Sequence, residues 1–287
     1  MENWMKYCLS LALILSALFF IKTSDRLSNE TYRELDINDR RKLSADYLAL
    51  AKSLEMGSPK AMRLLDKAAR INPENELVWK ELSWPYLYSG DYKKWSEYID
   101  KAISLNPQEW QGNRGYIKLS FFKDYGGALY DIEAHDTIKT EISFRGRVYA
   151  TSYLKGLCYL GLENYELASS SFLSYLESIE NKQGSFEVNP MANIYLGIIE
   201  NYHQNYDEAL NYLNPAMQEE KPLADSHYHA AYANFMLGKN ELANEQVESA
   251  LQLFDTGKYN QERMVEVQYQ LYHRNIERLA QDIACFL

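Results

Sequence analysis

Apolar and small residues recur along the chain with a period close to 34 residues. The strings "LLDKAARINPENELVWKELS" and "YIDKAISLNPQEWQGNRGYI" share Asp-Lys-Ala-x-x-x-Asn-Pro, and their prolines, Pro73 and Pro107, are 34 residues apart. Counting back from each proline, one residue opens a helix, a large apolar residue follows it four positions later, and an alanine follows three after that. This spacing places the three side chains on one helical face. The opening positions are Ala61, Trp95, Ala128, Ala168, Ala209 and Ala243.

The intervals between these six positions are 34, 33, 40, 41 and 34 residues. A turn precedes each opening position, usually with a tyrosine, and a second apolar helix runs before the turn. That second helix carries a small residue where it would approach its partner, as at Gly156, Gly197 and Ala231. Each unit therefore reads as a helix–turn–helix that buries its apolar face only against its neighbours. The two longer intervals predict insertions within 136–150 and 179–190, which we interpret as loop growth.

The second helix–turn–helix repeat contains the residues that resemble a known protein family. Trp79-x2-Leu82-Ser83-x2-Tyr86, followed by Trp95-x3-Ile99-x2-Ala102-x4-Pro107, resembles the pattern of the tetratricopeptide repeat (TPR) family, apart from Trp95 in place of Ala and Ser83 in place of Gly. The resemblance covers residues 42 to 255. It implies an all-α, right-handed superhelical solenoid of about six TPR-like units over 42–257, with 258–287 as a C-terminal capping helix. Trp95 falls where the two helices of a unit meet, so we expect a packing role for it.

The N-terminal segment 1–25 differs in character from the repeats. Tyr7 to Ile21 is a 15-residue uncharged run bracketed by Lys6 and Lys22. Extended to residues 4–21, it approaches the length of a membrane span, whereas the shorter run suits a secretory signal. We favour an uncleaved membrane anchor over a cleaved signal, which would give a secreted protein, and expect 26–41 to be a linker or leading helix. The basic residues after the run favour a cytoplasmic body and the signal-like length favours export; of the two we favour export.

Composition limits the kinds of partner that we expect the chain to bind. The chain of 287 residues is 46% hydrophobic and carries a net charge of −10, which argues against a nucleic-acid backbone as partner. Its 24 Tyr and 5 Trp are residues typical of protein contact surfaces. The three cysteines are too few for a disulfide framework, and we expect Cys158 and Cys285 to be free and buried.

No catalytic or phosphate-binding motif is present in the sequence. Asp131 and His135 share a helical face, so they suggest either a metal-binding pair or, as the simpler interpretation, a solvated helix end. Cys158 lies within an apolar stripe and reads as core. We therefore expect no enzymatic activity, no cofactor and no metal.

The TPR resemblance implies that the first helix of each unit lines a concave groove that receives a peptide or a partner helix. Lys80, Asn113 and Arg114 resemble part of a set that clamps a terminal carboxylate, but Trp84 stands where that set has Asn. An aromatic-lined groove suits an apolar or aromatic-bearing peptide. We expect half of the tyrosines to be core instead. The candidate partner-binding residues are Lys80, Trp84, Tyr88, Asn113, Arg114, Ile117, Tyr153, Tyr195, Tyr202, Tyr228 and Tyr232.

Three functions fit these observations. The first is a non-catalytic scaffold, tethered at or exported across a membrane, that binds a protein or peptide in its groove. The second is a soluble sensor or regulator whose curvature responds to a ligand. The third is an enzyme accessory subunit that uses the Asp131–His135 region.

Overall fold

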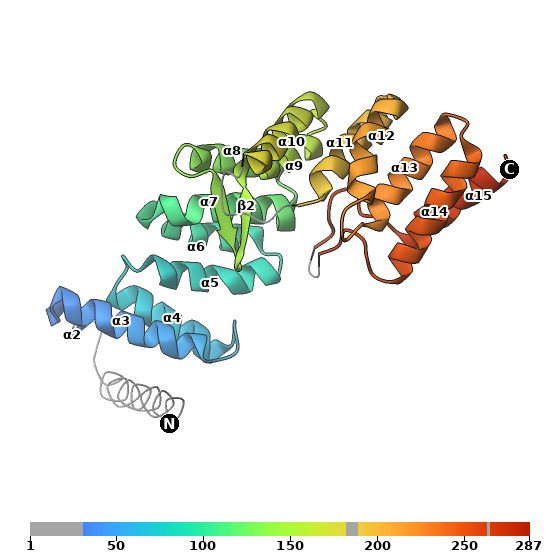
Figure 1. Ribbon diagram of the computed structural model, residues 1–287. Helices are drawn as coiled ribbons and strands as arrows, with labels where there is room; N and C mark the ends of the chain where they lie inside the picture. The colour runs from blue at the N-terminus through green and yellow to red at the C-terminus, as the bar shows by residue number, and fades with distance from the viewer. Residues whose placement is uncertain (1–30, 182–188, 263–264) are drawn as a thin grey trace, which may run out of the picture. The chain divides into compact units, whose positions relative to one another are not determined.

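The structure is a computed structural model that describes residues 31–181, 189–262 and 265–287 (Figure 1). The chain divides into two compact units, Met1–Trp110 and Gln111–Leu287, where the sequence suggested one continuous solenoid. The expected anchor or signal, residues 1–25, lies outside the described residues.

The first unit is made of antiparallel helix pairs. We call the first helix of each pair an A helix and the second a B helix. A helix α3 packs on α4, α4 on α5, and α5 on α6. The helices are α2 (Thr31–Glu34), α3 (Ile37–Lys52), α4 (Pro59–Ile71), α5 (Glu76–Tyr88) and α6 (Tyr92–Leu105).

The second unit continues the same pairing, with successive helices packed from α8 to α15. Within it, A helix α11 also packs on A helix α13, as in a solenoid. The division between the units falls inside α7 (Pro107–Ile117), which continues as the short π-helix η1 (Lys118–Phe122). The remaining elements are α8 (Tyr125–Asp136), β1 (Glu141–Phe144), β2 (Arg147–Ala150), α9 (Thr151–Gly161), α10 (Tyr165–Glu180), α11 (Met191–Tyr202), α12 (Tyr206–Met217), α13 (Ala224–Met236), α14 (Asn240–Asp255) and α15 (His273–Ala284).

The repeat register predicted from the sequence is confirmed. All six opening positions lie at the start of a B helix and are buried, including Trp95, which is fully buried. The large residues four positions later are buried as well. The pairs α3/α4, α5/α6, α7–η1/α8, α9/α10, α11/α12 and α13/α14 are the six expected units, so the all-α solenoid class is confirmed within each compact unit.

Polar side chains fix where the B helices begin. The side chains of Asp91, Asp124 and Asn164 each accept a hydrogen bond from the backbone N–H three residues later. Such N-caps satisfy amide groups that have no partner inside the helix. The hairpin turns are thereby set by residues just before each opening position.

The first insertion is a β-hairpin, which the sequence did not predict. Strands β1 and β2 pair antiparallel, with Glu141 opposite Ala150 and Phe144 opposite Arg147. Ile142 is buried, and a Cβ at Gly112 of α7 would lie 2.8 Å from side-chain atoms of both Ile142 and His135. Gly112 therefore lets the hairpin approach α7 closely. The second insertion falls largely on 182–188, outside the described residues.

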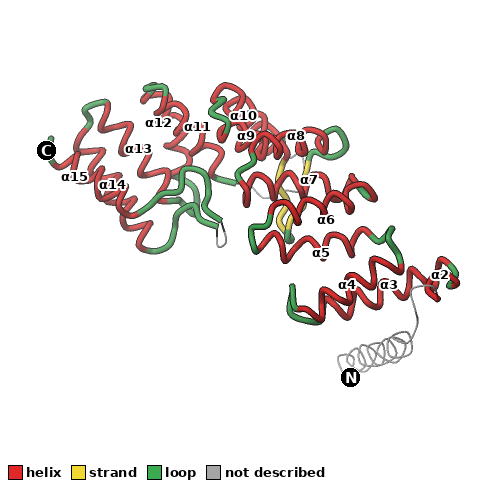
Figure 2. The backbone as a smooth tube through the Cα atoms, turned by 180° about the vertical axis from the view of Figure 1, so that it is seen from behind, coloured by secondary structure: helices red, strands yellow, loops and turns green. Residues whose placement is uncertain are grey.

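The C-terminal capping helix is shorter than expected. Helicity is confined to His273–Ala284, whereas residues 258–262 and 265–272 form an extended loop, which we call the strap. Figure 2 shows this loop, between α14 and α15, against α11 and α13. Helix α15 does cover the last pair, since it packs on α13 and α14 and buries Ile276, Leu279 and Ile283.

Candidate functional site on the A helices

Three of the expected partner-binding residues form one stripe on α5. Lys80, Trp84 and Tyr88 are spaced four residues apart, so they lie above one another on the helix surface. The rings of Trp84 and Tyr88 stack with centroids 5.8 Å apart and planes 16° apart. The Lys80 ammonium lies 5.1 Å from the centroid of the Trp84 ring, a cation–π contact. All three are half-buried, so the stripe keeps partly accessible aromatic area.

Lys80 also forms an ion pair with a carboxylate. Its Nζ lies 2.9 Å from Oε1 of Glu81, which lies 3.8 Å from Nζ of Lys52. Ion pairs of this partly exposed kind contribute little to stability. The Lys80 ammonium thus contacts both the Trp84 ring and the Glu81 carboxylate.

Arg114 is half-buried and pairs with a carboxylate of its own unit, so its part in partner binding stays a prediction. Its Nε donates to Oδ2 of Asp131 at 2.8 Å, and its Nη2 donates to Oδ1 at 2.5 Å. Nζ of Lys118 lies 2.9 Å from Oδ2 of Asp131, whose side chain is fully buried. This bidentate pairing fixes the orientation of the guanidinium and satisfies two of its N–H donors.

The partial carboxylate clamp that the resemblance implied stays a prediction. Lys80 belongs to the first compact unit, whereas Asn113 and Arg114 belong to the second. Asn113 is half-buried on α7, and its role stays a prediction.

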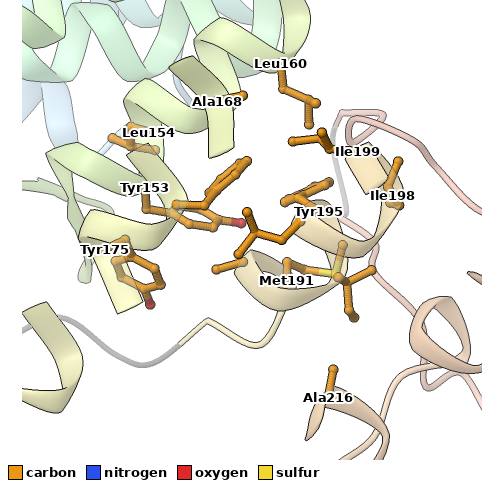
Figure 3. Packing of buried hydrophobic residues seen from close by; sticks show 14 of the residues in the cluster. Tyr153, Leu154, Leu160, Ala168, Tyr175, Met191, Tyr195, Ile198, Ile199 and Ala216 are labelled. Carbon is orange, nitrogen blue, oxygen red and sulfur yellow. The ribbon is translucent and has the colours of Figure 1, made fainter. Parts of the chain in front are cut away.

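Ile117, Tyr153 and Tyr195 are buried in the core of the second unit rather than displayed on its surface. Figure 3 shows Tyr153 and Tyr195 in this cluster. The centroid of the Phe172 ring lies 5.9 Å from that of Tyr153 and 5.4 Å from that of Tyr195. Burial raises the pKa of both hydroxyls far above the usual Tyr value. The expectation that part of the tyrosine set is core is confirmed for these residues.

Tyr195 nevertheless meets an extended segment of chain. Its hydroxyl accepts a hydrogen bond from Nδ2 of Asn260 at 3.2 Å and donates to the carbonyl of Gln268 at 3.5 Å. Both partners belong to the strap. The residue that the sequence placed in a peptide groove is thus covered by a segment of its own chain.

The last three candidates lie on α11 and α13. Tyr202 is 62% exposed, and its ring lies 4.4 Å from that of Tyr165. Tyr228 and Tyr232 are half-buried against the cluster beneath α15. These three residues belong to the second compact unit and the α5 stripe belongs to the first, and their part in partner binding stays a prediction.

The simpler interpretation of Asp131 and His135 is wrong. Both residues are buried, so this is not a solvated helix end. Asp131 faces two cations, and Nε2 of His135 lies 2.9 Å from the carbonyl of Glu141 in the hairpin. Among the described residues, no three His, Cys, Asp or Glu side chains group as metal ligands.

The two cysteines of the repeat body are both free. Cys158 is buried, and burial raises the pKa of its thiol, which argues against a nucleophilic role. Cys285 is exposed, contrary to expectation, because it follows the last turn of α15.

None of the helices over residues 31–181, 189–262 and 265–287 has the length and apolar character needed to cross a bilayer. The expected membrane segment, residues 4–21, lies outside these ranges.

Comparison with known proteins supports the fold. No protein-family model matches the chain, and no curated protein matches its sequence. Among solved structures, it is similar to PilW, a widely conserved type IV pilus biogenesis factor, at 19% identity over 74% of this chain and 94% of that one, with a TM-score of 0.54. It is similar to PilF of Pseudomonas aeruginosa at 16% identity over 79% of this chain and 94% of that one, with a TM-score of 0.51.

Yeast Tom70 is similar at 12% identity over 94% of this chain and 58% of that one, with a TM-score of 0.52. At these identities the likeness concerns the fold alone. The chain has the helical repeat fold of tetratricopeptide repeat proteins.

Proposed function

We propose that the chain is a non-catalytic helical repeat scaffold that binds a protein or peptide partner through the aromatic stripe Lys80–Trp84–Tyr88. The observation that carries the proposal is the stacking of Trp84 on Tyr88 with a lysine over the indole. Stacked, half-buried aromatics on a rigid helix supply contact area at low cost in side-chain entropy. The stripe suits a peptide with apolar or aromatic anchors.

The acidic character of the chain is consistent with such a partner. With a net charge of −10, the chain does not attract a polyanion, and Lys80 already has Glu81 beside it. Binding through the stripe would depend on apolar contact area, so it should respond weakly to salt.

Selection from a random peptide library tests the proposal without requiring the identity of the natural partner. Displayed peptides would be selected on the full chain, and their affinities measured by fluorescence polarisation. Trp84→Ala should weaken the selected peptides by about tenfold to a hundredfold, the loss typical of an interface anchor. Tyr130→Ala on α8, a 70% exposed aromatic outside the stripe, is the matched control.

The outcome that contradicts the proposal is equal binding by wild type and Trp84→Ala, with circular dichroism confirming that both are folded. Binding lost in Tyr130→Ala but kept in Trp84→Ala would move the site away from α5.

The proposal also includes insertion of residues 4–21 in a membrane as an uncleaved anchor, with the repeat body exported. Its support is the uncharged run of Tyr7–Ile21 between two lysines. Carbonate-resistant membrane association, together with protease accessibility of the body from outside the cell, is the expected result. A chain recovered in the soluble fraction at full length would refute the anchor.

A further inference from the structure

The strap crosses the A-helix side of the second unit and returns. From the end of α14, the backbone N–H of Asn260 donates to Oδ2 of Asp225 on α13 at 2.8 Å, and its side chain reaches Tyr195 on α11. Glu262 then pairs with Arg147 of β2 at 2.8 Å. On the return, Nε2 of Gln268 donates to the carbonyl of Leu157 on α9 at 2.8 Å.

Several of these contacts are made to the backbone of the strap. The Asp225 carboxylate accepts from the Asn260 N–H, the Tyr195 hydroxyl donates to the Gln268 carbonyl, and Nζ of Lys123 donates to the carbonyl of Glu266. Contacts to backbone groups recognise an extended chain largely irrespective of its sequence. The A-helix side of the second unit is therefore built to hold a peptide.

The strap fills this surface incompletely. Cavities of about 100 Å³ and about 320 Å³ remain beside it. Tyr149, Tyr153, Asn189, Asn260 and Glu262 line both cavities. Among the described residues from 258 to 272, Leu271 alone is buried. A segment with so little buried apolar area opens locally at low free-energy cost.

The charges beneath the strap favour an acidic occupant. Lys123 and Arg147 are cations that contact it, through the Glu266 carbonyl and the Glu262 carboxylate, and Asp225 is a carboxylate that contacts it through the Asn260 N–H. Val265 and Val267 line the smaller cavity together with Tyr116 and Leu157. The surface thus accepts a carboxylate opposite Arg147, together with β-branched residues, in one extended segment.

We propose that the A-helix side of the second unit is a peptide-binding groove that the strap occupies in the resting chain, and that an extended partner peptide bearing acidic and β-branched residues takes its place. The proposal goes beyond the stripe on α5, because it concerns the other unit and a different occupant. It holds whether or not Trp84 binds a partner.

The test loosens the strap without changing the groove. The triple variant Asn260→Ala/Glu262→Ala/Gln268→Ala removes strap side chains that contact Tyr195, Arg147 and Leu157. A fluorescein-labelled synthetic peptide spanning residues 258–272 serves as the probe, with a scrambled peptide beside it. Gln261→Ala, an exposed strap position whose amide donates locally to Gly257, is the matched control.

The triple variant should bind the labelled peptide on the order of tenfold more tightly than wild type, since a competing internal occupant lowers apparent affinity by the fraction of open groove. Gln261→Ala should bind like wild type. Adding Tyr195→Phe to the triple variant, which keeps the ring and removes the hydroxyl, should weaken the peptide again. Hydrogen exchange should show faster exchange of the amide of Asn260 in the triple variant, with α9, α11 and α13 still protected.

Three outcomes would overturn the proposal. The first is a strap that exchanges faster while peptide binding is unchanged. The second is a strap that stays as protected in the triple variant as in wild type. The third is a dimer of the triple variant in light scattering, because the strap of a second copy would then be the occupant. None of these results bears on the binding of selected peptides by Trp84.

Discussion

Arg114, Lys118 and Asp131 form a charge cluster in which two cations face one fully buried carboxylate. The sequence places Arg114 on an A helix, where the TPR resemblance implies a ligand contact. Asp131 is 17 residues away on the B helix of the same unit, and spacing alone does not reveal that the two side chains meet. A charged residue on the expected face can thus pair with a buried carboxylate of its own repeat.

Substitution of Asp131 by alanine should lower the free energy of unfolding by about 3–5 kcal/mol, because two partly desolvated cations lose their partner. Arg114→Ala should cost less, since Lys118 still pairs with Asp131 at 2.9 Å. Chemical unfolding followed by circular dichroism measures both. A stable Arg114→Ala variant that has lost peptide binding would instead return Arg114 to the binding site.

His229 on α13 should make the fold sensitive to acid. Burial lowers the pKa of its imidazole to about 4 from 6.5, so the folded state holds it neutral while the unfolded chain takes up a proton. The contribution is present above pH 6.5 and is lost as the pH falls toward 4, by up to about 3 kcal/mol at 1.4 kcal/mol per pKa unit. Unfolding free energies measured across this range should depend less on pH in His229→Gln. The exposed His203→Gln is the control, and an unchanged pH profile in His229→Gln would contradict the prediction.

At the scale of elements, every A–B turn requires one left-handed residue. A glycine adopts it in three of the six repeats: Gly57, Gly90 and Gly238. In the other three repeats the residue is Lys123, Glu163 or Gln204. Only glycine adopts this backbone conformation without steric cost. The non-glycine turns are therefore strained. In the third repeat, the side chain of Lys123 contacts the strap from that left-handed position.

Gln204→Gly should raise the free energy of unfolding by about 1 kcal/mol, because it relieves the left-handed conformation of a residue with a Cβ. Gly238→Ala is the reciprocal change. A Cβ there meets no atom within 4 Å, so its expected cost of about 1 kcal/mol is purely conformational. Midpoints of urea unfolding report both, and shifts of the same sign in the two variants would contradict the explanation.

The two repeats with insertions share a departure from the repeat pattern. Seven residues after the opening position, four of the six repeats have alanine, whereas the third repeat has His135 and the fourth has Tyr175. Both are buried and bond to the inserted segments: His135 to the Glu141 carbonyl, and the Tyr175 hydroxyl to the Asn189 N–H at 2.7 Å. Each insertion is thus held by a polar side chain at a position where the other four repeats have alanine.

Helical periodicity misled at the C-terminus. Met264, Val267, Leu271, Ile276 and Leu279 have helical spacing, yet only the last two lie in α15. Tyr269 adopts a left-handed conformation, and Tyr272 with Asn275 caps the helix start. Because the strap bonds to residues far away in sequence, such as Leu157 and Tyr195, its extended form is set by tertiary contacts that no local pattern contains.

For the whole molecule, the features that follow from the repeat pattern could be predicted from the sequence. Helix pairing and the buried register follow from small and apolar residues at fixed spacing, so the packing role expected for Trp95 agrees with its full burial. Of the candidate residues, those of the α5 stripe stack together, Ile117, Tyr153 and Tyr195 are buried, and Arg114 pairs with a buried carboxylate. Spacing identifies which helix carries a residue, but the strap and the hairpin decide which residues remain accessible.

Photo-crosslinking in cells tests most directly whether the α5 stripe carries partner binding. A benzophenone amino acid would replace Trp84 in one variant and the exposed Tyr130 of α8 in another, and adducts would be identified by mass spectrometry. The account predicts a discrete adduct from position 84 that is absent from position 130. Adducts from position 130 alone, or none from position 84 in a folded and expressed chain, would contradict it.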